Sequence, residues 1–146
     1  MIVGKKEKMN IEELKKQLSI RQKLLDLFRQ LLGLQTELDK MKIKEMIVRI
    51  AKEEGVDEKL LLAVIECENR KFDTKAINKN SDGTFDYGLC QFNSKWYIEK
   101  MKLITVAEAL DNPEKAVRVM AKRFKEGWAK DWVCYSTKKY ISYLKV

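Results

Sequence analysis

Residues 66–97 read ECENRKFDTKAINKNSDGTFDYGLCQFNSKWY. From 73 to 84 this stretch is rich in Asn, Asp, Ser, Thr and Gly, and Asp82-Gly83 is a typical hairpin-turn pair. Apolar and polar residues then mix from Thr84 to Phe92, as in a half-buried sheet. We therefore expect a small β-hairpin or three-stranded sheet at this point of the chain.

Helical patterns flank the polar stretch on both sides. Before it, an apolar stripe from Ile43 to Ala51 stops at Gly55, and Asp57 is placed to cap a second helix that ends near Glu68. After it, the expected helix signals are a capping box at 105–108, the Asn-Pro pair at 112–113, a stop at Gly127, and Ser136 capping a last helix with Tyr140, Ile141 and Leu144. The sequence therefore predicts a mostly helical α+β domain with one inserted hairpin.

Residues 1–42 carry a different pattern. Seven apolar residues from Ile20 to Met41 step alternately by four and three, which predicts a long amphipathic helix with a coiled-coil-like seam, capped by Asn10. A second apolar row widens this face and consists of Leu14, Leu18, Leu25, Phe28 and Leu32. Two interpretations stay open: the helix packs on its own domain, or it self-associates or docks a partner. We expect 1–42 and 43–146 to be separate parts of the chain.

The composition narrows the classes of function. The chain has 146 residues, of which 45% are hydrophobic and 36% charged, as in a folded domain. It has no His, which excludes Ser-His-Asp and Cys-His catalysis and a His-ligated zinc site. No apolar run approaches the roughly 20 residues of a membrane span, and the opening MIVGKKEK lacks the apolar region of a signal peptide. The net charge of +8 favours an anionic partner such as nucleic acid, acidic lipid or a cell-wall polymer.

Three interpretations compete for the polar stretch. Asn78, Asn80 and Asp82-Gly83 are spaced like the first half of an EF-hand calcium loop, but its twelfth position would be Leu89 instead of Glu. A structural turn without chemistry is the second interpretation.

The third interpretation is a sugar-cleaving site with two carboxylates. Glu68 falls at a helix end near apolar Ile65 and Phe72, where burial would raise its pKa into the range of a general acid. Asp86 lies beyond a polar hairpin, where solvent would keep it charged. Two carboxylates in contrasting surroundings are what glycosidic cleavage requires, and amides and aromatic residues, which bind sugars, follow directly in the chain.

Residues 72–97 resemble the active-site hairpin region of animal C-type lysozymes. The shared features are Phe72, Thr74, Ala76, Asn78, Asn80, Asp82-Gly83, Asp86-Tyr87-Gly88, Gln91, Asn93-Ser94 and Trp96. Residues 50–69, IAKEEGVDEKLLLAVIECEN, resemble the bacterial and phage soluble lytic transglycosylase (SLT) domain, in which Gly-Val-Asp precedes a helix ending in the catalytic Glu-Ser. Gly127, Trp132 and Tyr140 also fit the C-terminal part of that domain. The resemblance covers roughly residues 43–146 and implies a lysozyme-like fold.

The resemblance assigns roles residue by residue. It implies that Glu68 is the catalytic acid and Asp86 the second carboxylate. The substrate-binding residues it implies are Asn78, Asn80, Gln91, Asn93, Trp96, Tyr97 and Tyr140. Because protein carboxylates supply the chemistry, we expect no metal and no cofactor.

Some positions depart from the family pattern. Asn69 replaces the Ser that usually follows the acid, and one extra residue separates Glu68 from Phe72, which makes Glu66 a rival. Two residues turn a helix by about 200°, so Glu66 and Glu68 cannot face the same cleft, and we expect Glu66 to be solvated. Trp128 and Trp132 are expected in the core.

The three cysteines allow one disulfide and one thiol, or three reduced thiols. We expect Cys67 and Cys90 in or near the core, with Cys67 able to reach Cys134. The disulfide set of the animal lysozymes is absent, which favours a bacterial or phage origin.

The predicted function is cleavage of the β-1,4 bond between N-acetylmuramic acid and N-acetylglucosamine in peptidoglycan, as a muramidase. The alternatives are a lytic transglycosylase that forms 1,6-anhydro products, and a non-catalytic wall-binding module. We expect no nucleic-acid partner, because no nucleic-acid-binding signature accompanies the basic charge. Such a substrate implies a cell-wall, extracytoplasmic or phage-associated location, although no export route is visible in the sequence.

Overall fold

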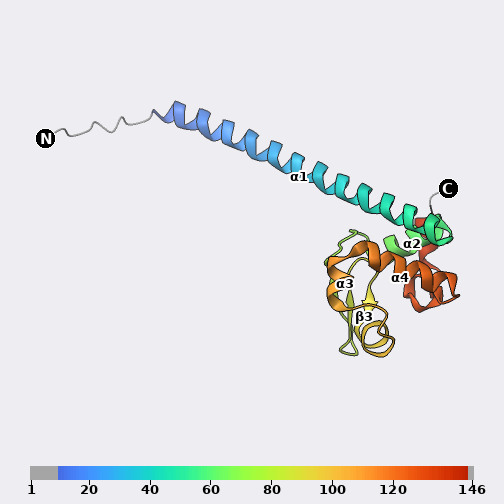
Figure 1. Cartoon of the computed structure of the whole chain (residues 1–146). Coiled ribbons are helices and arrows are strands. Elements are labelled where there is room, and N and C mark those ends of the chain that lie inside the picture. The colour runs from blue at the N-terminus through green and yellow to red at the C-terminus, as the bar shows by residue number, and fades with distance from the viewer. Residues whose placement is uncertain (1–9, 145–146) are drawn as a thin grey trace. The chain divides into compact units, whose positions relative to one another are not determined.

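The computed structural model describes residues 10–144, which form eleven helices and strands. In chain order they are α1 (Ile11–Glu54), α2 (Glu58–Glu68), β1 (Ile77–Lys79), β2 (Phe85–Tyr87), β3 (Phe92–Asn93), the π-helix η1 (Ser94–Lys100), α3 (Val106–Asp111), α4 (Pro113–Lys125), the 3₁₀-helix η2 (Ala129–Asp131), α5 (Val133–Ser136) and the 3₁₀-helix η3 (Lys139–Tyr143) (Figure 1). The predicted mostly helical α+β class is confirmed.

The three strands form one antiparallel sheet in the order β1-β2-β3. In its register Asn78 lies opposite Asp86, and Asp86 lies opposite Asn93. The predicted turn at Asp82-Gly83 joins β1 to β2, and Gly83 has the positive φ of 84° that such turns favour. The sheet therefore brings an acid and two amides side by side.

The predicted helix signals are present in the structure. Asp57 Oδ1 accepts a hydrogen bond from the Leu60 amide at 2.9 Å and caps α2. Thr105 and Glu108 form a reciprocal capping box at the start of α3. Four further signals agree with prediction. Asn10 accepts a hydrogen bond from the Glu12 amide, Gly55 and Gly127 have positive φ just past helix ends, and Asn112 caps α4 ahead of Pro113.

The core of the domain lies between α1, α2, α4 and the aromatic residues that follow the sheet. From α1 it takes only residues near the C-terminal end, Ile47, Ile50 and Ala51. Fully buried side chains include Leu61, Val64, Ile65, Leu89, Phe92, Val117 and Met120. This packing fixes the C-terminal end of α2, where Glu68 lies.

Two expectations about the C-terminal third are wrong. Ser136 ends α5 instead of starting a helix, because its hydroxyl donates back to the Val133 carbonyl and Lys138 then adopts a left-handed conformation. Trp128 is 43% exposed, with Arg123 and Lys130 lying over its ring, so it is not a core residue. The π-helix η1 was also not foreseen.

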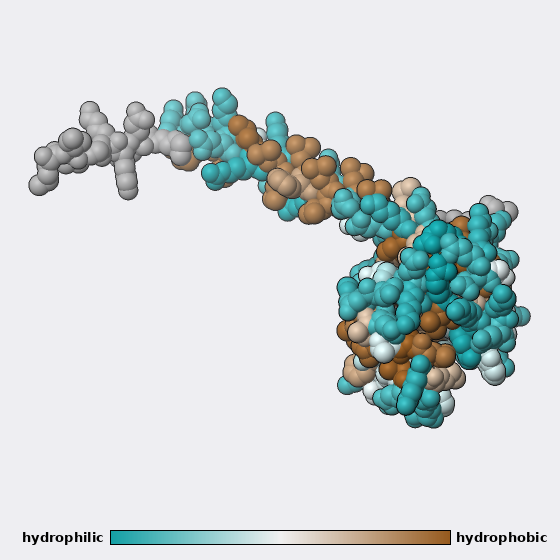
Figure 2. All heavy atoms as spheres, in the orientation of Figure 1, coloured by the Kyte–Doolittle hydropathy of each residue, from teal (hydrophilic) through white to brown (hydrophobic). Residues whose placement is uncertain are grey.

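α1 runs without a break through the predicted boundary at 42–43, and the chain divides into two compact units between Asp39 and Lys40. On residues 11–38 of α1 the large apolar side chains are exposed, and Figure 2 shows them as brown patches along the helix. None of the described helices combines the length and the apolar character needed to cross a membrane. The prediction made for MIVGKKEK concerns residues outside the described range.

Candidate active site

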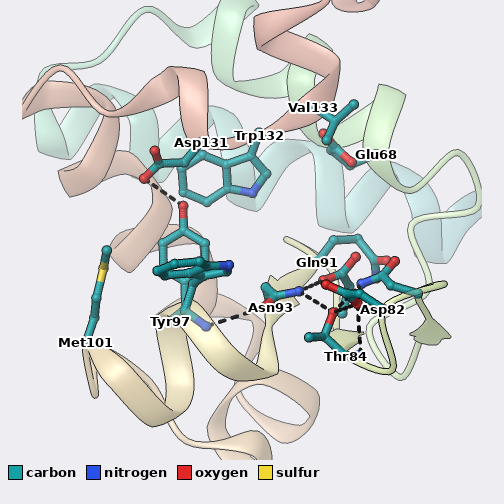
Figure 3. A pocket seen from close by; sticks show the side chains of 13 residues that line it. Glu68, Asp82, Thr84, Gln91, Asn93, Tyr97, Met101, Asp131, Trp132 and Val133 are labelled. Atoms are coloured by element: carbon teal, nitrogen blue, oxygen red, sulfur yellow. Dashed lines mark hydrogen bonds between the residues drawn. The ribbon is translucent and has the colours of Figure 1, made fainter.

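A cleft of about 450 Å³ lies between the end of α2, the sheet and the segment that follows α4. Glu68, the last residue of α2, and Asp86, in the middle of β2, both line it. Figure 3 shows the Glu68 side chain on one wall with Val133, facing the polar side chains of the sheet. Two carboxyl groups that are 18 residues apart in the sequence thus share one cavity.

The surroundings of Glu68 are those of a general acid. Burial, and next the negative charge of Asp86, raise the pKa of Glu68, while the amide of Cys134 and the charge of Lys139 act in the opposite direction. The Cys134 N–H donates to Glu68 Oε1 at 2.8 Å. Within the described residues Oε2 accepts no hydrogen bond. One carboxyl oxygen is therefore held by the protein, and the other is available to a substrate.

Asp86 belongs to a chain of polar side chains on the sheet. Asn93 Nδ2 donates to Asp86 Oδ1 at 2.9 Å and also to Thr84 Oγ1 at 3.0 Å. Thr84 Oγ1 in turn donates to Asp82 Oδ1 at 2.7 Å, and Asn80 Nδ2 donates to Thr84 Oγ1 at 3.0 Å. These bonds orient Asp86 before any substrate is bound.

The same hydrogen bonds exclude the calcium-loop interpretation. Asn78 lies on β1, and Asn80 and Asp82 belong to the hairpin turn, so the segment between helices is a strand pair and not an EF-hand loop. Asn78 Nδ2 donates to Gln91 Oε1 at 2.6 Å, and Gln91 lines the cleft. Asn78 itself is not a lining residue. It contacts the cleft through Gln91.

The aromatic residues of the cleft differ in exposure. Trp96 is 50% exposed, which leaves a ring face for a sugar, whereas Tyr97 is buried and donates its hydroxyl to Asp131 Oδ2 at 2.9 Å. Trp132 is buried as predicted and also lines the cleft, where its ring stacks on Tyr97 with centroids 5.4 Å apart. Part of the cleft lining is therefore aromatic.

Two residues singled out in the sequence lie elsewhere. Tyr140 does not line the cleft, and its ring stacks on Tyr135 with centroids 5.3 Å apart. Glu66 does not line it either. It is paired with Lys44 at 3.3 Å and is largely buried, so the expectation of a solvated side chain is wrong, although the two glutamates do face different surroundings.

Sequence reasoning missed several residues of the cleft. Asp131, Val133 and Met101 line it, as do Asp82 and Thr84. Asp131 and Val133 flank Trp132, and no spacing relative to Glu68 or Asp86 indicates them. The Cys134 amide was missed because a backbone donor has no signature in the sequence.

A mostly helical domain with a three-stranded sheet and a partly buried glutamate on the wall of a polar cleft is the arrangement of the lysozyme-like superfamily. The family model described as the transglycosylase SLT domain matches residues 45–130, and the chain belongs to that family. The predicted enzyme class, a glycosidase or lytic transglycosylase, agrees with this family.

Two lysozymes share a short segment with the chain. Lysozyme C-1 of Anas platyrhynchos is 48% identical over 31 residues, which is 21% of each protein. Lysozyme C of Dromaius novaehollandiae is 58% identical over 26 residues, or 18% of each protein. The chain thus matches about a fifth of the length of these relatives, so the likeness concerns one segment and not whole proteins.

Proposed function

We propose that the domain cleaves the β-1,4 glycosidic bond between N-acetylmuramic acid and N-acetylglucosamine in peptidoglycan. The observation that carries this proposal is the partly buried Glu68 carboxyl, which shares a polar cleft with Asp86. Membership of the SLT family supports it independently.

Glu68 acts as the general acid. Its raised pKa, caused first by burial and then by Asp86, keeps the proton on the carboxyl at a pH where an exposed glutamate has lost it. The Cys134 amide holds Oε1, so the proton on Oε2 is presented to the glycosidic oxygen. Its transfer makes the departing sugar a neutral alcohol.

Asp86 then stabilises the positive charge that develops on the sugar ring, as nucleophile or as ion-pair partner. Asn93 and the polar chain behind it restrict the carboxylate to one orientation. This arrangement of two carboxyls supports hydrolysis, that is, a muramidase.

Substrate binding falls to the residues that line the cleft. The amides of Asn80, Gln91 and Asn93 are placed to bind sugar hydroxyls and N-acetyl groups, and the half-exposed ring of Trp96 is placed to stack on a sugar face. Tyr97 also lines the cleft, where its ring stacks on Trp132. Tyr140, which lies outside the cleft, is not part of the proposal.

Family membership favours a second candidate, a lytic transglycosylase. In that mechanism Glu68 alone acts as acid and then as base, and the 6-hydroxyl of the muramic acid closes a 1,6-anhydro ring. The two candidates differ in their products and in their need for Asp86.

Mass spectrometry of the muropeptides released from purified peptidoglycan tests the proposal. Hydrolysis gives products with a free reducing end, and Asp86→Asn abolishes them. Anhydro products, lighter by one water and still formed by Asp86→Asn, would establish the transglycosylase instead. If the wild-type protein releases no muropeptides at any pH or from any substrate, the result would instead support a non-catalytic wall-binding module.

The charge and location fit this substrate. Residues 40–146 contain 22 basic and 16 acidic residues, so the domain carries the positive charge that an anionic cell wall attracts. We propose that the domain works outside the cytoplasmic membrane or as part of a phage, where an oxidising environment also suits its disulfide.

For α1 we propose association with further copies of this chain. Residues 10–39 contain five basic and five acidic residues, so this segment neither repels its copies nor is drawn to an anionic surface. The two apolar rows lie about 130° apart around the helix, which gives each helix two neighbours and favours at least three copies. Covering both rows would bury on the order of 1,000 Å² per chain, compared with about 800 Å² per partner in a standard interface.

A further inference from the structure

Cys134 is connected to the proposed acid, Glu68, in two ways: by a hydrogen bond and, through the neighbouring Cys67, by a disulfide. Cys67, the neighbour of Glu68 in α2, forms a disulfide with Cys134 of α5, as the sequence allowed. The amide of this same Cys134 donates to Glu68 Oε1 at 2.8 Å. The disulfide therefore ties the donor to the helix that carries the acceptor.

Other contacts also hold this segment against the core of the domain. Trp132 is buried, donates from Nε1 to the Cys90 carbonyl at 2.8 Å, and packs on Phe92, Tyr97 and Phe124. Tyr135 packs on Phe124 and Tyr140. None of these contacts acts on the Cys134 amide itself, whereas the disulfide links the residue that carries this donor covalently to the helix that carries Glu68.

We propose that the Cys67–Cys134 disulfide is a redox latch that positions Glu68 through the Cys134 amide, so that full activity requires the oxidised form. This inference rests on the proposed role of Glu68 as the acid. Cys67 and Cys134 are positioning residues, since they touch the acid and not the substrate.

The disulfide is reachable from a cavity that does not contain the acid. A second cavity of about 480 Å³ is lined by both cysteines together with Arg70, Lys138, Lys139, Ser142 and Tyr143. Its basic side chains attract anionic thiols and stabilise the thiolates formed on reduction. A reductant therefore reaches the sulfur atoms without entering the cleft that holds Glu68 and Asp86.

The redox step is a thiol–disulfide exchange with a small dithiol. The dithiol supplies two electrons and two protons, the bond between Cys67 and Cys134 breaks to give two thiols, and the dithiol closes to a cyclic disulfide. After reduction α5 is no longer covalently linked to α2, and only noncovalent packing holds the Cys134 amide near the Glu68 carboxyl.

The charged and polar groups that face Glu68 determine the sign of the effect. They are Asp86 on β2, Lys139 on η3 and the Cys134 amide on α5. The amide favours the ionised carboxylate, so its loss raises the pKa of Glu68. A bond that only stabilised the fold would leave this titration unchanged.

The experiment compares the oxidised protein, the protein reduced with dithiothreitol, and the Cys67→Ser/Cys134→Ser variant. Glu68 is titrated by carbon-detected NMR without substrate, and kcat and KM are measured against pH on soluble glycan. Cys90→Ala, which keeps the disulfide, is the matched control and must respond to reduction as the wild type does. Circular dichroism at the assay temperature reports the fold.

On reduction we expect kcat to fall about tenfold or more, as for loss of a hydrogen bond to a charged group, with KM nearly unchanged. The titration midpoint of Glu68 and the alkaline limb of the rate profile both move to higher pH. Reoxidation restores the kcat and the Glu68 titration of the oxidised wild-type protein. The double variant has the kcat and titration of the reduced protein, and dithiothreitol does not change them.

An unmoved Glu68 titration, an unchanged kcat, or unfolding of the reduced protein at low temperature would each overturn the latch. If the oxidised protein cleaves nothing but its Glu68 titration still moves on reduction, the proposed function fails and the positioning by Cys134 stands.

Discussion

Glu68 is ionisable, partly buried and in contact with a backbone donor, and this combination makes its substitution informative. Glu68→Gln keeps an oxygen to accept the Cys134 amide but has no proton to transfer. We expect glycan cleavage to fall by about 10²- to 10⁴-fold, the usual contribution of a general acid, with an unchanged circular dichroism spectrum. Activity within a few-fold of wild type in the muropeptide assay would remove Glu68 from the mechanism.

The same substitution should change stability in a pH-dependent way. Because burial raises the pKa of Glu68 in the folded protein, the folded state holds this proton more tightly than the unfolded state. The wild type therefore loses stability as pH rises from the ordinary glutamate range through the raised pKa. Glu68→Gln has no carboxyl to ionise and does not lose this stability. The free energy of unfolding in urea of Glu68→Gln, relative to that of the wild type, should therefore be higher at pH 7 than at pH 4. A difference independent of pH would contradict the burial of the charge.

At the scale of elements, the approach of the sheet to α3 depends on Gly88. Its φ is 73°, and a Cβ placed there would lie 2.0 Å from the Ala109 carbonyl oxygen. Gly88→Ala should therefore destabilise the domain by about 2 kcal/mol or more, through both strain and displacement of α3. Gly55, with φ of 71° and open space where a Cβ would lie, is the matched control. Gly55→Ala should cost only about 1 kcal/mol, and equal losses in urea unfolding would disprove the close approach.

At the scale of the whole molecule, the apolar rows of α1 should control association. Leu31 belongs to the first row and is 61% exposed, whereas the neighbouring Gln30 lies on the polar face. In size-exclusion chromatography with light scattering at micromolar concentration, we expect the full chain to form at least trimers and Leu31→Glu to give monomers. Gln30→Glu, which adds the same charge, should behave as the wild type. A monomeric full chain would disprove association through α1.

The sequence by itself determined the local structure and the identity of the two central carboxyls. Asp57, Thr105 and Asn112 cap helices with side chains that bond to the amide three residues later, so their roles can be predicted from the local sequence. The hairpin at Asp82-Gly83 is local in the same sense. Asp86 was predicted from the 26-residue resemblance over residues 72–97 and Glu68 from the SLT-like segment that precedes it, and the disulfide was found only as one allowed pairing.

Only the tertiary structure decided what surrounds those carboxyls. Asp131, Val133 and the Cys134 amide reach the cleft from more than 60 residues beyond Glu68, while Tyr140 lies outside the cleft and Trp128 at the surface. The physical reason is that helix periodicity and capping depend on short-range contacts. The burial that raises the pKa of Glu68 depends instead on which distant segments pack against it.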